Sequence, residues 1–367
     1  MGRLLITFLL SVIGLMSGLT FLWRVPLIEK SRPAFKRQLK VSVIIPARNE
    51  EQSLPQLLSS LKDQNFPIEE IIVVDDDSID RTLEVAKEFG VQVISEFEHT
   101  GKSAACWAGA KQAKGDYLVF LDADTFFVGS DALEKALNTY CQEMESGLLS
   151  IQPYHVIKQF YETLAIVPNI VVMAGLNRFS LFQNLPKRGA FGPFILVNKE
   201  EYESVGGHGA ILDSHMDDIE LAKLYKTHHL PVEVFGGQES IHFRMFPEGV
   251  KQLLNGITKS LVHGSKGTHA VTLIAIGLWL LSTILPIVLF VLASMQEALL
   301  FIFLSIIMYG VGCLHFRWLM NKVGRFPWQT ALVPFFYVLS FLVIYAWAFI
   351  QVYILKKVSW RGRVHKV

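Results

Sequence analysis

The chain has 367 residues, of which 51% are hydrophobic, so neither a fully water-soluble globular protein nor a disordered chain describes it well. Its 34 basic and 33 acidic residues leave a net charge of +1, which provides no bulk attraction for nucleic acid. The length allows one or two domains in addition to membrane segments.

The first predicted element is an N-terminal transmembrane anchor over residues 1–25. Residues 4–23 form an uncharged apolar run of about 20 residues, the length that crosses a hydrocarbon core of roughly 30 Å. This run is too long for a signal-peptide core, so we favour an anchor over a cleaved signal peptide. Basic residues are denser behind the run than in front of it, where only Arg3 lies, and the positive-inside rule therefore puts the following segment in the cytosol. They are Arg24, Lys30, Arg32, Lys36, Arg37 and Lys40.

Residues 40–265 are soluble in character and alternate short β-branched runs with amphipathic stretches. This alternation is typical of parallel β/α units, so we predict an α/β fold with a mostly parallel sheet. Apolar positions after Glu50 recur at helical spacing, which predicts a helix there. The predicted strands are Val41–Ile45, Ile71–Val74, Val91–Ile94 and Tyr117–Leu121.

Charged side chains collect where three of these strands end. They are Arg48 and Glu50 after the first strand, Asp75 and Asp77 after the second, and Asp122 and Asp124 after the fourth. Ligands of parallel sheets bind at the carboxyl ends of strands, and carboxylates at this density repel one another unless a cation lies among them. Hard oxygen ligands of this kind suit Mg²⁺ or Mn²⁺ bound to a diphosphate, and capping of helices or loops is the alternative interpretation.

Two later stretches bear on the binding of an acceptor. The apolar run Leu164–Leu176 is too short to span a bilayer, so it lies either at the membrane interface or in an ordinary core. A helix predicted over 217–228 opens with Asp217 and Asp218, and acids are favourable near any helix N-terminus. Two histidines lie nearby, although a lone histidine is more often structural. They are His208 and His215.

Three more apolar runs follow, at about 270–293, 298–315 and 331–355. They assign the segment 266–355 to the bilayer or its interface, with a basic cytosolic tail over 356–367. By the positive-inside rule, the basic residues between the last two runs and those in the tail should both lie in the cytosol. Three simple crossings would put these two groups on opposite sides of the membrane. We therefore expect one run to be re-entrant or interfacial, with Pro286 and Pro334 as candidate break points.

Four stretches resemble glycosyltransferase family 2, whose members are inverting enzymes with the GT-A nucleotide-binding fold. They read VSVIIPARNEE at 41–51, IIVVDDDSIDRT at 71–82, GKSAACWAGAKQAKGDYLVFLDAD at 101–124 and MDDIELA at 216–222. Within the family, the chain is similar to membrane-bound carotenoid-acid glycosyltransferases in GLLSIQPYH at 147–155, FRMFPEG at 243–249 and SWRGR at 359–363. The resemblance implies a metal-dependent hexosyltransferase with UDP-glucose as its donor.

The resemblance also implies which residues bind this donor. The nucleoside pocket is lined by Pro46, Arg48, Glu50, Asp75 and Asp77. The Asp75 carboxylate accepts the imide N–H of uracil. Lys102 and Arg244 contact the diphosphate. For Arg244, an ordinary surface arginine is the alternative interpretation. Asp122 and Asp124 hold the ribose and the Mg²⁺ or Mn²⁺ ion, and Asp124 is the more direct metal ligand.

In the family, the second acid of a pair removes the proton of a hydroxyl acceptor, and Asp218 matches this position, with Asp217 before it. A carboxylic acid acceptor is already ionised at neutral pH and needs no base, so the acid pair leaves the acceptor open. Residues 241–245 lack the Gln-x-x-Arg-Trp sequence of polysaccharide-forming members, and we therefore do not expect polymerisation.

We predict a multi-pass protein of the cell membrane whose transferase domain faces the cytosol. It moves a sugar from a UDP-sugar to a lipid-like acceptor, and the favoured acceptor is a carotenoid carboxylic acid, which gives a glycosyl ester. Two alternatives stay open: transfer to a hydroxyl or phosphate lipid, such as diacylglycerol or polyprenyl phosphate, and a non-catalytic lipid-binding relative. We expect no nucleic-acid partner, and the oligomeric state is open.

Overall fold

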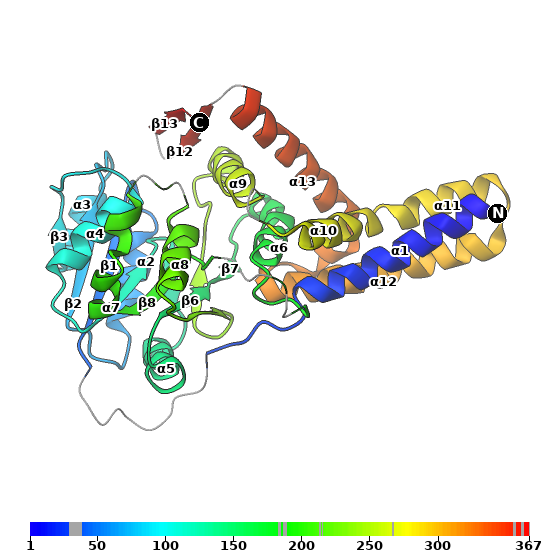
Figure 1. Cartoon of the computed structure of the whole chain (residues 1–367). Coiled ribbons are helices and arrows are strands. Elements are labelled where there is room, and N and C mark those ends of the chain that lie inside the picture. The colour runs from blue at the N-terminus through cyan, green and yellow to red at the C-terminus, as the bar shows by residue number, and fades with distance from the viewer. Residues whose placement is uncertain are drawn as a thin grey trace. The chain divides into compact units, whose positions relative to one another are not determined.

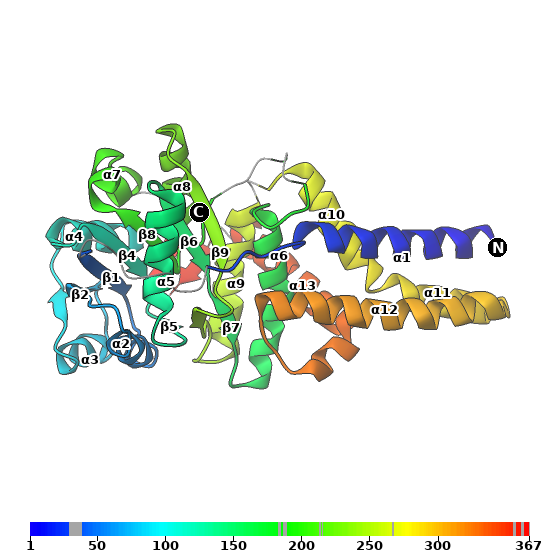
Figure 2. The same cartoon turned by 90° about the horizontal axis from the view of Figure 1, so that it is seen from below.

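The computed structural model describes residues 1–28, 39–182, 185, 189–212, 214, 216–265, 268–354, 357–360 and 363–366 (Figures 1 and 2). The chain forms two compact units. The α/β unit comprises Pro26–His155 and Arg188–Pro247, and the helical unit comprises Met1–Val25, Val156–Lys187 and Glu248–Val367. Several residues of the sequence argument lie outside the described residues: Lys30, Arg32, Lys36, Arg37, His215, Lys356 and Arg361.

The main sheet of the α/β unit has seven strands in the order β3-β2-β1-β4-β8-β6-β9. Their bounds are β1 Val41–Ala47, β2 Glu70–Asp75, β3 Gln92–Ile94, β4 Tyr117–Leu121, β6 Leu148–Gln152, β8 Phe194–Asn198 and β9 Val232–Gly236. Strand β8 runs antiparallel to β4 and β6, and the other pairs are parallel. The predicted mostly parallel α/β sheet is confirmed.

Helices cover both faces of this sheet, which explains why β1 and its neighbours read as continuous apolar runs. Successive side chains of β1 alternate: Val43 and Ile45 pack in one core cluster, and Ile44 packs in the other. On the Ile44 side, a Cβ at Gly109 would lie 2.6 Å from Ile44 Cγ2, so glycine lets its helix approach the sheet closely. The helices of this unit are α2 Leu54–Lys62, α3 Thr82–Glu88, α4 Lys102–Gln112, α5 Ala132–Thr139, α7 Lys199–Ser204 and α8 Asp217–Thr227.

A small second sheet lies beside the end of β4. Strand β10 (Ile241–Phe243) pairs with β5 (Thr125–Phe127) in the antiparallel sense and with β7 (Tyr154–Val156) in the parallel sense. Strand β5 follows directly on the acidic segment after β4. This sheet therefore ties the segment after β10 to the acidic end of the main sheet.

The helical unit is built around the N-terminal helix α1 (Gly2–Phe21). Helices α1, α11 and α12 lie side by side, and α1 packs along α10 as well (Figures 1 and 2). Small residues permit this approach, since a Cβ at Gly14 would lie 2.3 Å from the carbonyl oxygen of Leu278. The Ser17 hydroxyl donates to the carbonyl of Ala275 at 3.0 Å. The bounds are α10 Ala270–Ser282, α11 Leu285–Met295 and α12 Leu299–Val323.

The remaining helices of this unit are α6 (Ile166–Gly175), α9 (Val250–Ser265) and α13 (Pro334–Phe349). Helix α6 packs against α9, α12 and α13, and most of its apolar side chains are buried there. The run Leu164–Leu176 is thus part of a core. Segments 156–187 and 248–265, which we expected within the 40–265 domain, group with the helical unit because α6 and α9 pack there.

Three described helices are long and apolar enough to cross a membrane: Gly2–Phe21, Leu299–Val323 and Pro334–Val352. Helices α10 and α11 pass the same test together but are bent by 44° at the break between them. The break falls just before Pro286, one of the two proline positions singled out in the sequence, and Pro334 begins α13. Near the C-terminus, β12 (Lys357–Trp360) pairs with β13 (Arg363–Lys366) in the antiparallel sense.

Candidate active site

Three neighbouring strands of the main sheet, β2, β1 and β4, end at one edge, as parallel strands must. The polar segments predicted at these strand ends are therefore close together. The backbone N–H of Asp76 donates to the carbonyl of Ala47 at 2.8 Å, which joins the ends of β2 and β1. Because β8 is antiparallel, it begins at this edge, and the Asp122 N–H donates to the carbonyl of Pro193 at 3.1 Å.

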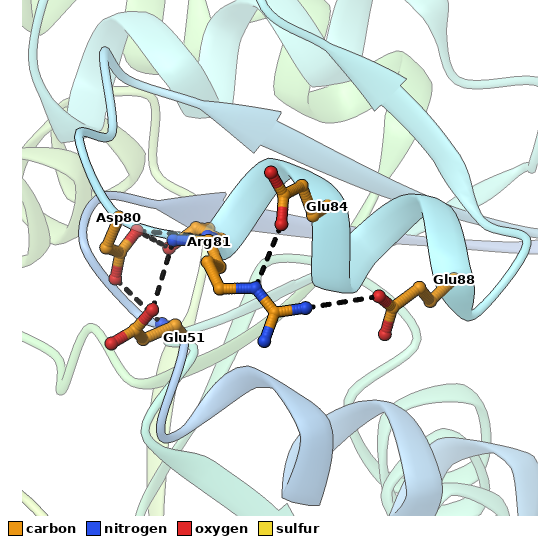
Figure 3. Close-up of polar contacts among 6 residues, drawn as sticks. Glu51, Asp80, Arg81, Glu84 and Glu88 are labelled. Atoms are coloured by element: carbon orange, nitrogen blue, oxygen red, sulfur yellow. Dashed lines mark hydrogen bonds and ion pairs between the residues drawn. The ribbon is translucent and has the colours of Figure 1, made fainter.

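The segments after β1 and β2 are tied together by polar contacts (Figure 3). The N–H of Glu51 donates to Asp80 at 3.1 Å, and the N–H of Arg81 donates to the Glu51 carboxylate at 3.1 Å. The Arg81 guanidinium bonds Glu84 at 2.9 Å and Glu88 at 3.4 Å, and the Glu84 hydrogen bond raises its pKa. These side chains are exposed, so their ion pairs add little stability. The contacts define the shape of the two segments.

Asp75, at the end of β2, is the residue predicted to accept the imide N–H of the uracil ring. Its side chain is buried, and Oδ2 accepts the N–H of Ser78 at 3.4 Å. Oδ1 is buried and has no hydrogen-bond partner among the described residues. A buried carboxylate oxygen without a donor is costly, so this atom suits a ligand N–H.

The other predicted nucleoside residues surround this position. Pro46 is in β1, paired with Val74, and Glu50 is buried after the end of that strand. The Arg48 guanidinium donates to the carbonyl of Asp76 and lies 3.9 Å from the exposed carboxylate of Asp77. The structure therefore brings these side chains to one edge of the sheet.

Lys102 lies at the centre of the acidic cluster. It is the first residue of α4, and its Nζ lies 2.6 Å from Asp122 Oδ1 and 3.6 Å from Asp217 Oδ2. Burial alone would lower the pKa of Lys102, but these two carboxylates outweigh it and hold the pKa well above its usual value. Lys102 is therefore a permanent cation at physiological pH.

Asp218 follows Asp217 at the start of α8. Burial, and then the neighbouring charge of Asp217, raise the pKa of Asp218 to about 6, while Lys102 acts in the opposite direction. One carboxylate oxygen accepts the N–H of Ile219 at 2.9 Å. A carboxylate with a pKa near neutrality can accept a proton during a reaction at physiological pH.

Asp124 and Arg244 meet through the small sheet. The backbone N–H of Arg244 donates to the carbonyl of Asp124 at 3.0 Å. Within the part of the chain that is described, no three histidine, cysteine or acidic side chains group closely enough to hold a metal ion. Asp122 already pairs with Lys102, so an ion bound to Asp124 would need oxygen ligands from a bound molecule.

Gly192 is a site residue that we did not predict from the sequence. A Cβ at this position would lie 3.0 Å from Lys102 Nζ and 3.3 Å from Asp218 Cβ. The residue precedes β8 in the segment GAFGPF at 189–194, and two glycines next to a buried strand are the signal that could have indicated a close approach. Glycine keeps open the space in front of the lysine and the acid.

Replacing Gly192 with alanine should lower turnover about tenfold or more while leaving the protein folded. The added methyl group meets the far end of a flexible lysine, so the amine moves rather than the backbone, and its contact with Asp122 lengthens. At 3.0 Å the amine has to give way by a few tenths of an ångström, and since misplacement of a reacting group by about 1 Å costs about a hundredfold, this smaller shift should cost about tenfold. Turnover and thermal unfolding of the purified protein are the measurements. The matched control is Gly277→Ala in α10, where an added Cβ meets nothing within 4 Å.

His208 has a structural position. It is buried, its Nδ1 lies 2.8 Å from the hydroxyl of Tyr202, and its ring packs against Phe120 at 4.9 Å between centroids. Burial lowers the pKa of His208 to about 4, so the ring is neutral at physiological pH. These contacts explain the histidine without a catalytic role.

Comparison with known proteins identifies the family. The model of the family described as "Glycosyl transferase family 2" matches residues 42–200. A protein named 4,4'-diaponeurosporenoate glycosyltransferase, from Staphylococcus aureus strain USA300, is 34% identical over 333 residues, which cover 89% of this chain and 88% of that protein. The protein of the same name from strain MRSA252 has the same identity and coverage, 34%, 89% and 88%.

A solved structure shares the fold. It is the mannosyltransferase PcManGT from Pyrobaculum calidifontis in complex with GDP-Man and Mn²⁺, with a TM-score of 0.53 and 17% identity over 94% of this chain and 99% of that one. Its likeness covers both the α/β unit and the apolar helices. With the family model and the long relatives at 34% identity, the conclusion is plain: this chain is a glycosyltransferase and belongs to glycosyltransferase family 2.

Proposed function

We propose that this protein transfers glucose from UDP-glucose to a carotenoid carboxylic acid, by a metal-dependent, inverting reaction that gives a glycosyl ester. The observation that carries the proposal is the cluster in which Lys102 lies between Asp122 and Asp217, with Asp218 beside it. The acceptor follows from the name of the relatives at 34% identity, and UDP-glucose is the donor that the family resemblance implies.

The donor binds along the edge formed by β2, β1 and β4. Asp75 accepts the imide N–H of uracil through its buried Oδ1, and Pro46, Arg48, Glu50 and Asp77 line the same pocket. Lys102 faces the diphosphate, and its raised pKa keeps it charged while the leaving group gains negative charge. Arg244 supports the same group from the small sheet.

Asp122 and Asp124 fit a hard divalent cation through their oxygen atoms, provided that the diphosphate supplies further ligands. Asp124 is the more direct ligand, because Asp122 is engaged by Lys102 at 2.6 Å. A bound Mg²⁺ or Mn²⁺ would neutralise charge on the diphosphate as it leaves. The side chains of the protein position the diphosphate for this reaction.

The reaction is one in-line displacement. A carboxylate oxygen of the acceptor attacks the anomeric carbon, and the bond from that carbon to the diphosphate oxygen breaks with its electron pair, so UDP leaves and the anomeric configuration inverts. A carboxylic acid is ionised at neutral pH and needs no base. With this acceptor, Asp218 orients the sugar hydroxyls.

The second candidate is transfer to a hydroxyl lipid, such as a diacylglycerol, and one observation favours it. The pKa of Asp218, raised by burial to about 6, suits a general base that takes the proton of an attacking hydroxyl. Transfer to a polyprenyl phosphate needs no such base. The Lys102 cluster argues against a non-catalytic lipid-binding relative, because a protein without turnover has no need to hold an acid of raised pKa beside a cation.

In the membrane, α1, the α10–α11 pair and α12 cross the bilayer, and α13 lies along its cytosolic surface. Helices α1, α11 and α12 lie side by side, whereas α13 runs at a steep incline to them (Figures 1 and 2). Three crossings that start outside the cell return the chain to the cytosol after α12. Both basic groups then lie on the cytosolic side, as does the transferase domain between the anchor and α10. They are Arg317, Lys322 and Arg325, and the tail residues Lys356, Lys357, Arg361, Arg363 and Lys366.

The test uses the full chain in detergent with UDP-glucose and Mn²⁺, with a carotenoid carboxylic acid and a diacylglycerol offered in parallel. Mass spectrometry follows the products, and a sample with chelator measures the metal dependence. We expect a glucosyl ester on the acid that disappears with the chelator. Product on the diacylglycerol alone would establish the second candidate, and no product on either acceptor with any UDP-hexose would overturn both.

A further inference from the structure

A groove of about 470 Å³ lies between α1 and α12, within the helical unit. Its lining comes from the end of α1, the residue Trp23 just after it and the second half of α12, and is mostly apolar and aromatic. The lining residues are Leu19, Trp23, Val311, Leu314, His315, Trp318 and Lys322. We call it the α1–α12 groove.

The length of the groove corresponds to one leaflet of a bilayer. Val311 and Lys322 are eleven residues apart on one helix, which at a rise of about 1.5 Å per residue is roughly 16 Å. The hydrocarbon core of a bilayer is about 30 Å thick. The groove lies at the C-terminal end of α1, so in the membrane topology proposed above it occupies the cytosolic leaflet.

The end of the groove carries a positive charge. Lys322 Nζ lies 3.4 Å from the carbonyl oxygen of Trp23 and 4.4 Å from the ring centroid of Trp318, so the amine is held over the groove. Both contacts are of the kind that a Lys side chain makes at a membrane surface. An anionic group at the end of an apolar chain would complement this charge.

His315 belongs to the wall of the groove but presents little of its surface there. The residue is 7% exposed, and its ring stacks on Trp318 at 5.8 Å and abuts the backbone of α1 at Gly18. Both ring nitrogens are covered by protein atoms, and the ring faces the backbone of Gly18. His315 therefore supplies bulk to the wall, and a ligand in the groove meets Leu314, Trp318 and Lys322.

We propose that the α1–α12 groove binds the acceptor, a long-chain carboxylic acid, with its apolar chain along Leu314 and Trp318 and its carboxylate at Lys322. The identity of this ligand rests on the proposed function, and the groove itself does not. The flat aromatic faces suit an extended polyene, and the single cation suits one carboxylate. The groove thus selects the acceptor by chain shape and by head-group charge.

The test is binding of cis-parinaric acid, a conjugated polyene carboxylic acid, to the full chain in lipid nanodiscs without UDP-glucose. Direct excitation of the probe reports binding, so added tryptophans do not contribute. Leu314→Trp should fill the groove and raise the Kd at least tenfold. Leu300→Trp is the matched control: Leu300 is on the same helix, is 66% exposed against 71% for Leu314, and does not line the groove. We expect it to leave the Kd unchanged.

A second pair of measurements isolates the charge. Lys322→Gln should raise the Kd for the acid several-fold and leave the Kd for its methyl ester unchanged. Equal Kd values for Leu314→Trp and the parent protein would overturn the proposal that this groove binds the acid, whether or not the protein transfers a sugar. If the expected pattern is found but no acid is glucosylated, the groove stands and the proposed transferase reaction fails.

Discussion

Asp124→Ala should lower kcat about a thousandfold in the presence of saturating UDP-glucose and Mn²⁺. Loss of electrostatic stabilisation at a developing charge costs about 4 kcal/mol, which corresponds to this factor. Asp124 is the more direct of the two candidate metal ligands, because Asp122 is paired with Lys102. Turnover measured across a range of Mn²⁺ concentrations is the readout, and the variant should also lose its dependence on added metal.

The matched control is Asp63→Ala, which removes an exposed acid at the end of α2 in the same unit. It should keep the turnover of the parent protein. Thermal unfolding of both variants shows whether the fold is intact. Full turnover of Asp124→Ala would remove the assignment of the metal site, and an unfolded Asp124→Ala should be replaced by Asp124→Asn, which keeps the shape of the side chain but removes its charge.

Asp218→Asn should separate the two acceptor classes. With a hydroxyl acceptor, the loss of a general base should lower kcat by a factor of about 100 to 10,000. With a carboxylic acid acceptor the reaction needs no base, and the loss should be about tenfold or less, from poorer orientation of the sugar. Glu220→Gln, on the same helix and paired with Lys223 at 3.2 Å, is the control and should change neither rate.

The pH dependence provides a second test of the same residue. A base acts in its deprotonated form, and burial raises the pKa of Asp218 to about 6. Turnover on a hydroxyl acceptor should therefore rise between pH 5 and 7 in the parent protein, because the fraction of deprotonated Asp218 increases through about pH 6. Asp218→Asn should lose this rise. A larger loss on the carboxylic acid than on the hydroxyl lipid would overturn the argument about the base.

The sequence predicted the central sheet well because buried parallel strands leave a strong local pattern. The predicted strand Tyr117–Leu121 matches β4, and Val41–Ile45 lies within β1. Both are continuous apolar runs bounded by polar residues, and such runs form strands wherever helices cover both faces. The acids follow these strands directly in sequence, so their common edge also follows from the parallel order.

The small sheet, the position of Gly192 and the grouping of α6 could not be predicted, because they depend on contacts between distant segments, which leave no local pattern in the sequence. Strands β5, β7 and β10 have three residues each, and they bring the amide of Arg244 to the carbonyl of Asp124 across more than a hundred residues. The proximity of Gly192 to Lys102 is of the same kind. Grouping of α6 with the C-terminal helices arises from packing, which hydrophobic periodicity alone does not distinguish from an interfacial helix.

The close packing of α1 also bears on how the protein can be engineered. A Cβ at Gly14 would lie 2.3 Å from the Leu278 carbonyl oxygen, and one at Gly18 would lie 2.5 Å from the indole of Trp279. The first helix is therefore a closely packed part of the helical unit and more than a membrane anchor. Exchanging it for another hydrophobic helix, or removing it to obtain a soluble enzyme, would expose the surfaces of the helices that it packs against. Shortened forms for crystallisation should therefore keep this helix.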